Sequence, residues 1–133
     1  MNLSRKSEYA LLALIDLAER YDDRPAKTAD IAARRHIPKK YLEQILLLLK
    51  GAGYARSTRG PEGGYALGRP PAKISLAEIV RLIDGAIAPV ESVSEHFYRH
   101  TPLEANEKIL GVFRDIRNYA ARKLESTKLS SLV

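Results

Sequence analysis

The chain has 133 residues and carries 22 lysines and arginines against 16 aspartates and glutamates, a net charge of +6. It contains no cysteine, which excludes disulfides, thiolate-bound zinc, cysteine-ligated iron–sulfur clusters and a cysteine nucleophile. With 45% hydrophobic and 29% charged residues, the composition is that of an ordered protein of one domain, or of a small domain with an appended helix.

The positive charge is concentrated in one part of the chain. Residues 24–73 hold 11 basic and 3 acidic residues, whereas residues 74–133 hold 8 of each. This asymmetry favours a basic module that binds nucleic acid or another anionic surface, joined to a neutral second part. The alternative is that the charges form an ordinary solvated face.

No apolar run is long enough to span a membrane. The segment Tyr9–Ala18 faintly resembles a signal peptide, but Asp16 interrupts it and no cleavage site follows. We therefore expect a cytoplasmic protein without membrane contact.

Residues 4–21 are expected to form the first helix, with Ser4 as its cap. The segment 9–18 is apolar on nearly every face except at Asp16. A helix of this kind must be buried on more than one side, so we expect it to contact its own domain and a further surface, possibly a second subunit.

Two helices joined by a short turn follow, at 28–35 with Thr28 as the cap and at 38–50 with Pro38 in the first position. In the second helix one face is predicted to be core: Leu42, Ile45, Leu46 and Leu49. The opposite face presents Lys39, Lys40, Glu43 and Gln44. Tyr41 and Leu48 lie on a shoulder, at the border between the two faces, and Leu47 breaks the pattern by falling on the polar face. This arrangement is that of a helix-turn-helix.

Segments 54–59 and 64–67 flank a turn rich in glycine and proline, which predicts a β-hairpin. A hairpin after a helix-turn-helix is the wing of a winged helix, here at about 54–68. The turn is not a phosphate-binding P-loop, because no Gly-Lys-Ser/Thr follows it. Arg56 and Arg59 favour a role in binding nucleic acid over a plain structural turn.

An extended connector is expected at 69–72. The second part then opens with a helix from Ser75 to Asp84, which begins with a Ser75/Glu78 capping box and has an apolar face of Ile79, Leu82 and Ile83. Residues 86–102 are ambiguous and could hold a short helix. A long helix at about 103–125 carries an apolar stripe that we expect to be covered by a second subunit rather than by its own core. The predicted fold is mainly α (α+β): a winged helix-turn-helix domain at 1–73 and a helical dimerisation or sensor region at 74–133.

The order of motifs resembles one known family. Those motifs are Ser-Arg-Lys-Ser-Glu-Tyr-Ala-Leu at 4–11, Tyr-Leu-Glu-Gln at 41–44, Gly-x-x-x-Ser-x-Arg-Gly-x-x-Gly-Gly-Tyr-x-Leu at 53–67, Arg-Pro-Pro at 69–71 and Thr-x-Leu-x-x-Leu-Val at 127–133. Together they are similar to the Rrf2 family of bacterial winged-helix transcription regulators, which includes IscR, NsrR and CymR, over nearly the whole chain.

The resemblance implies a homodimer, paired through the first and the long C-terminal helix, that binds double-stranded DNA. It places Tyr41, Glu43 and Gln44 in the major groove and Arg59, with the turn glycines Gly60, Gly63 and Gly64, at the adjacent minor groove. It also implies phosphate contacts from the N-terminal segment, through Ser4, Arg5, Lys6 and Tyr9.

The chemistry of these residues agrees with those roles. Gln44 can pair with adenine, Glu43 can accept from cytosine, and Lys39 and Lys40 suit phosphates. An arginine beside small glycines can enter a narrow minor groove. The alternatives are that Tyr41 packs on the shoulder, that Glu43 pairs with Lys39 or Lys40, and that Arg59 is an idle surface charge.

The chain departs from the family where cluster-binding members carry three cysteines, at about 88–106 here, so no iron–sulfur cluster or other cofactor is expected. His96 and His100 would share a helical face and could bind a metal with Glu95 or with Glu8, whose position resembles that of an acidic ligand from the other subunit. Ordinary hydrogen bonds are the favoured interpretation of this pair. A further departure is Pro38, where relatives often have a capping serine.

The leading hypothesis is a sequence-specific DNA-binding regulator, a repressor that acts as a homodimer on a palindromic operator. The alternatives are a metal-responsive sensor that uses His96 and His100, and a regulator controlled by a partner protein. No Ser-His-Asp set, paired-carboxylate cleft or H-E-x-x-H motif supports an enzyme.

Overall fold

A computed structural model describes all residues, 1–133, and contains five α-helices, one two-stranded hairpin and four short 3₁₀ turns. The chain divides into two compact units: residues 5–74 with 128–133, and residues 75–127 with 1–4. The mainly α winged-helix fold predicted from the sequence is confirmed. None of the helices combines the length and the apolar character that crossing a membrane requires.

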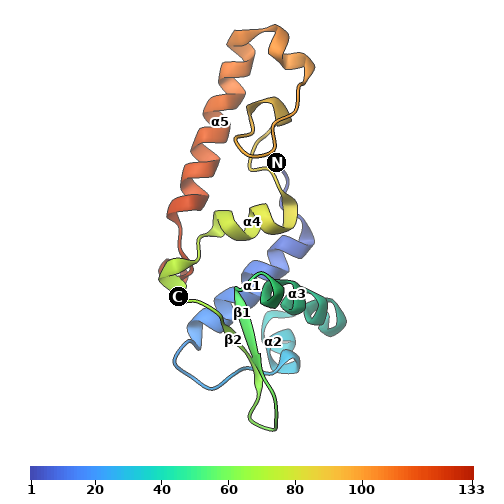
Figure 1. Cartoon of the computed structure of the whole chain (residues 1–133), viewed down its shortest axis with the longest axis vertical. Coiled ribbons are helices and arrows are strands. Elements are labelled where there is room, and N and C mark those ends of the chain that lie inside the picture. The colour runs from blue at the N-terminus through green and yellow to red at the C-terminus, as the bar shows by residue number, and fades with distance from the viewer. The chain divides into compact units, whose positions relative to one another are not determined.

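The first unit is built from three helices and the hairpin: α1 (Arg5–Glu19), α2 (Thr28–Arg35), α3 (Lys39–Gly51), β1 (Ala55–Thr58) and β2 (Gly64–Leu67) (Figure 1). Its core is aliphatic, and the predicted seam of α3 lies in it. Fully buried side chains include Leu14, Ile31, Leu42, Ile45, Leu46 and Leu49. Because α1 contributes to this core together with α2 and α3, the helix-turn-helix has a rigid base.

The turn between α2 and α3 depends on one left-handed residue. His36 has φ 54° and ψ 46°, and its backbone N–H donates to the Ala32 carbonyl, which ends α2. Ile37 follows with only 4% of its surface exposed and anchors the turn in the core. The prediction that Thr28 caps α2 is wrong, because Thr28 is the first helical residue and Lys27 holds the cap position. Pro38 likewise lies one residue before α3 rather than in its first turn.

The hairpin pairs β1 and β2 in antiparallel register, with Ala55 opposite Leu67 and Thr58 opposite Gly64. A third short segment joins it, because Ala26 and Tyr65 exchange two backbone hydrogen bonds of 2.8 and 2.7 Å. This pairing fixes the hairpin, close to its turn, to the segment that leads into α2. The turn of the hairpin extends beyond the three helices of the unit (Figure 1).

The connector after the hairpin was predicted to be extended, but it is extended only in part. Pro71–Lys73 form a 3₁₀ turn, for which proline's fixed φ is suited in the first position. The C-terminal turn Leu129–Leu132 joins the same unit: Leu129 is fully buried, and its N–H donates to the Ile74 carbonyl at 3.0 Å.

The second unit contains α4 (Leu76–Asp84) and α5 (Glu107–Ser126) (Figure 1). The Ser75/Glu78 capping box is present as predicted, and it opens α4. The buried face of α4 consists of Ala77, Ile79 and Val80, whereas Leu82, which belongs to the predicted apolar face, is 39% exposed.

The long helix begins four residues later than predicted. Pro102–Ala105 form a separate 3₁₀ turn, and the Asn106 side chain caps α5 by accepting from the Ile109 N–H at 3.1 Å. Phe113 packs on a small core of Ala88, Val93 and Leu110. The other side of α5 exposes large apolar residues: Ile109, Val112, Ile116 and Tyr119.

Candidate nucleic-acid interface

One face of α3 is polar, exposed and without internal partners. Lys39, Lys40, Glu43 and Gln44 are all exposed, and none of them takes part in a hydrogen bond or ion pair within the chain. Glu43 therefore does not pair with Lys39 or Lys40, which was the alternative interpretation of its presence. The opposite face is held by four fully buried aliphatic side chains, so the helix presents these polar groups in a fixed direction.

Tyr41 lies at the edge of this face and contacts α1. Its ring meets that of Tyr9 edge-to-face, with 5.6 Å between the centroids and 82° between the ring planes. Both side chains are half-buried. The contact fixes both rings. Packing at the edge of the polar face, the alternative interpretation of Tyr41, is therefore one of its roles.

The hairpin carries an unpaired cation at its turn. Arg59 follows β1 directly, is exposed, and has no hydrogen-bond or ion-pair partner. Gly60 comes next with φ 98°, a conformation that side-chain-bearing residues seldom adopt, and the Gly63 N–H donates to the Gly60 carbonyl at 2.9 Å. Arg59 therefore lies on an exposed turn whose backbone is closed by the hydrogen bond between Gly63 and Gly60.

The other two turn glycines serve the chain's own backbone. A Cβ on Gly63 would lie 2.1 Å from the Thr58 carbonyl oxygen, and one on Gly64 would lie 2.4 Å from that of Ala26. Gly63 is buried and Gly64 half-buried, whereas Gly60 is exposed. The backbone therefore approaches itself closely at both glycines, inside the turn at Gly63 and against the segment before α2 at Gly64. An ion pair of 2.7 Å between Arg24 and Glu62 also joins the loop before α2 to the turn.

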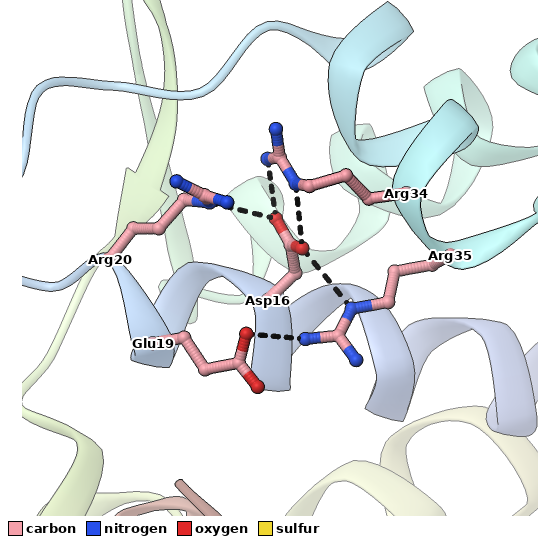
Figure 2. A network of polar contacts seen from close by, with 5 residues as sticks. All are labelled: Asp16, Glu19, Arg20, Arg34 and Arg35. Carbon is pink, nitrogen blue, oxygen red and sulfur yellow. Dashed lines mark hydrogen bonds and ion pairs between the residues drawn. The ribbon is translucent and has the colours of Figure 1, made fainter.

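A buried carboxylate joins α1 to the end of α2. Asp16 is 1% exposed and receives two hydrogen bonds from Arg34, of 3.1 and 2.8 Å, and one of 3.1 Å from Arg35 (Figure 2). Arg20 lies 3.8 Å away, and Arg35 also binds Glu19 at 2.7 Å. The sequence showed Asp16 only as an interruption of an apolar segment. Its partners Arg34 and Arg35 lie 18 and 19 residues further along the chain, and no local pattern links them to it.

The electrostatics of this cluster follow from its burial and its partners. Burial by itself would raise the pKa of Asp16, but the hydrogen bonds and charges of Arg34 and Arg35 outweigh it and hold that pKa below its usual value. Asp16 is therefore ionised at neutral pH. Its charge fixes the C-terminal turn of α2, from which the chain passes directly into α3.

The N-terminal candidates are not equally open. The Ser4 amide and hydroxyl both donate to Asp84, at 2.9 and 2.5 Å, within the second unit. Arg5 forms an exposed ion pair of 3.1 Å with Glu8. Lys6 is half-buried without an ion-pair partner. Lys6 and Tyr9 therefore offer a phosphate a better contact than Ser4, whose donors already face a carboxylate.

The metal candidates do not come together. His96 and His100 lie in a segment that is not helical, so they do not share a helical face as expected. His100 binds Glu104, which also accepts from Tyr98 at 2.5 Å, and His96 lies 3.8 Å from Glu95. No three histidine, aspartate or glutamate side chains gather anywhere in the chain. With no thiolate in the sequence, these residues do not fit an iron–sulfur cluster.

Comparisons with known proteins agree with this geometry. Residues 3–133 match the family described as Rrf2, iron-dependent transcriptional regulator. The chain is 45% identical over 100 residues to an rrf2-like HTH-type transcriptional regulator of Rhodobacter capsulatus, covering 73% of this chain and 67% of that protein. It is 33% identical over 132 residues to the HTH-type transcriptional regulator CymR of Bacillus subtilis, covering 99% and 89%.

The solved structures include that of CymR, described as the global cysteine regulator of B. subtilis. It superposes with a TM-score of 0.81 at 32% identity, covering 99% of this chain and 95% of CymR. The relatives and the fold are those of transcriptional regulators and not of enzymes.

Proposed function

Because the chain belongs to the Rrf2 family of DNA-binding transcriptional regulators, we propose that it is a repressor that binds a palindromic operator as a homodimer. The proposal puts α3 in the major groove and the hairpin turn in the adjacent minor groove. It is carried by one observation: the exposed face of α3 and Arg59 present polar groups that nothing in the chain satisfies.

The unpaired groups on α3 match the edges of base pairs. Gln44 can donate to and accept from the N7 and N6 positions of adenine, and Glu43 can accept from the N4 amino group of cytosine. Lys39 and Lys40, at the start of the helix, suit phosphates and set the register of the helix on the duplex. Because Arg59 is exposed and uncompensated, it suits the negative potential of a narrow minor groove.

The homodimer is supported by the apolar stripe on α5. The side chains of Ile109, Val112, Ile116 and Tyr119 are 42, 56, 49 and 69% exposed and recur at intervals of three or four residues. They therefore lie along one side of a helix of about 30 Å. A second copy of the same helix would cover this stripe in a symmetric interface, and two-fold symmetry in the protein requires a palindrome in the DNA.

Such a regulator acts in the cytoplasm, where the chromosome is. It works without an iron–sulfur cluster, because the segment that would hold one has no thiolate. Control by a partner protein stays a prediction.

Selection of bound duplexes from a random library tests the proposal. We expect the enriched sites to share an inverted repeat, with half-site centres separated by whole helical turns of about 10 base pairs. Enrichment of a single unrepeated motif would contradict the homodimer, and recovery of no shared motif would contradict sequence-specific binding. A reporter gene downstream of the selected site should fall in expression when the protein is produced; a rise would make it an activator.

A further inference from the structure

Leu47 is an exposed aliphatic side chain at the centre of the polar face of α3. Of its surface, 60% is exposed, the largest fraction of any leucine in the chain. The core side of the helix is already complete, because Leu42, Ile45, Leu46 and Leu49 are each fully buried. Leu47 therefore lies outside the seam that holds α3 in place.

Helical geometry puts Leu47 among the predicted base-reading residues. At 100° per residue it lies about 40° around the helix from Glu43, about 60° from Gln44 and about 20° from Lys40. The four positions are spaced i, i+3, i+4 and i+7, which brings them onto one side of a helix. A surface that meets the floor of the major groove through Glu43 and Gln44 must also bring Leu47 there.

The floor of the major groove offers an apolar side chain one specific partner. Every base edge there presents hydrogen-bond donors or acceptors, and thymine alone adds a C5-methyl group. The amide and carboxylate neighbours of Leu47 satisfy polar edges, whereas a leucine among polar edges would leave them without water or a partner. The environment that suits Leu47 in a complex is therefore a methyl group.

We propose that Leu47 reads thymine, by packing against the C5-methyl group of one thymine in each half-site. This inference rests on the proposed function, because it requires α3 to lie in the major groove. Leu47 is about 4.5 Å along the helix axis from Gln44 and about 6 Å from Glu43. The thymine thus lies within about two base pairs of the bases that those two residues contact.

The test replaces thymine by deoxyuridine, which keeps every hydrogen-bonding group and removes only the methyl. Each thymine of the selected operator is replaced in turn, symmetrically in both half-sites, and affinity is measured by fluorescence anisotropy. Removing one apolar methyl from each half-site should weaken binding by the wild-type protein about 15-fold at one position, because each methyl contributes about fourfold. Substitution at thymines that Leu47 does not touch should leave affinity within twofold.

Two variants assign the effect to the side chain. Leu47→Ser should bind the thymine and deoxyuridine operators within twofold of each other, and Leu47→Met should keep most of the preference for thymine. Because the side chain is exposed, both variants should melt within about 2 °C of the wild type. The circular dichroism melt checks that neither result comes from unfolding.

Two results would overturn the proposal while the proposed function stands: a wild-type protein that selects a palindrome yet is indifferent to deoxyuridine at every position, or a Leu47→Ser variant that keeps the full preference. A change of oligomeric state in Leu47→Ser, seen by light scattering, would also overturn it, by showing that the residue meets protein. Failure to select any palindrome would instead contradict the proposed function.

Discussion

Replacing Asp16 by asparagine removes the charge at the centre of the arginine cluster while keeping the shape of the side chain. The carboxylate is 1% exposed and accepts three hydrogen bonds of 2.8–3.1 Å, two from Arg34 and one from Arg35. An amide can accept at only one of its two heteroatoms. Its NH₂ group would face a guanidinium, which is also a donor.

The size of the expected loss of stability follows from how deeply Asp16 and its arginine partners are buried. Removing one partner of a buried ion pair costs about 3–5 kcal/mol, but the Arg34 and Arg35 side chains are 34 and 22% exposed and water can solvate part of their charge. We therefore expect Asp16→Asn to lower the free energy of unfolding by about 2–3 kcal/mol, and the melting temperature by roughly 10 °C for a chain of this size.

Thermal and urea denaturation, followed by circular dichroism, measure the effect. Glu19→Gln is the matched control: it removes a carboxylate from the same cluster, but one whose side chain is 44% exposed and which has a single partner. The control should lose less than about 1 kcal/mol. If the two variants melt within 2 °C of each other, the buried charge does not hold α1 to α2 and the reasoning is wrong.

The same cluster makes a prediction about pH. Because the pKa of Asp16 is lower in the folded protein than its usual value of 3.8, the folded state binds fewer protons there than the unfolded state. The contribution to stability is present above about pH 4 and disappears as the pH falls through the folded pKa. The stability difference between wild type and Asp16→Asn should therefore be constant from pH 5 to 7 and shrink below pH 4. A difference that grows on acidification would contradict this sign.

Three further substitutions test the interface, the dimer and the hairpin. Arg59→Ala should weaken operator binding about 30-fold and relax the preference for A·T pairs beneath the hairpin. The reason is that a dimeric complex would lose two guanidinium groups from the minor grooves. Affinity within twofold of wild type would refute the placement of Arg59 in the minor groove. Ile116→Glu should raise the dimer dissociation constant on the order of 100-fold in sedimentation equilibrium, since two copies enter the interface, whereas Arg122→Gln, with the same change of charge on α5, should not. Gly64→Ala should lose about 3 kcal/mol of stability through its clash with the chain before α2. Gly51→Ala, where a Cβ meets nothing within 4 Å, should change the stability by less than about 1 kcal/mol; equal melts would show that the hairpin can move away from the segment before α2.

Features coded by neighbouring residues could be predicted from the sequence. The buried seam of α3 follows from a 3.6-residue period, and all four of its leucines and isoleucines are fully buried. The Ser75/Glu78 capping box and the hairpin around the glycine turn also depend on local chemistry alone. The polar face of α3 follows from the same period, but the absence of partners on that face does not.

Features that require residues distant in the chain could not be predicted. Asp16 is the clearest case, because nothing beside it in the sequence shows that Arg34 and Arg35 return to neutralise it. The bridge between Ala26 and Tyr65 involves a single residue, which has no alternation to detect.

The ends of helices do not follow from the residue type of a cap alone. Thr28 is a good cap residue but lies inside α2, while Asn106 caps α5 after an intervening 3₁₀ turn begun by Pro102. The four-residue spacing of His96 and His100 had meaning only on a helix, and that segment is not helical.

Competition binding tests the central claim, that the exposed face of α3 reads sequence, most directly. The affinity of wild type and of Gln44→Ala is measured for the selected operator and for a scrambled duplex of the same composition and length. Wild type should prefer the operator by at least about 1,000-fold, and Gln44→Ala should lose at least about tenfold of that preference with unchanged affinity for the scrambled duplex. An equal loss on both duplexes, or no loss on either, would contradict the claim.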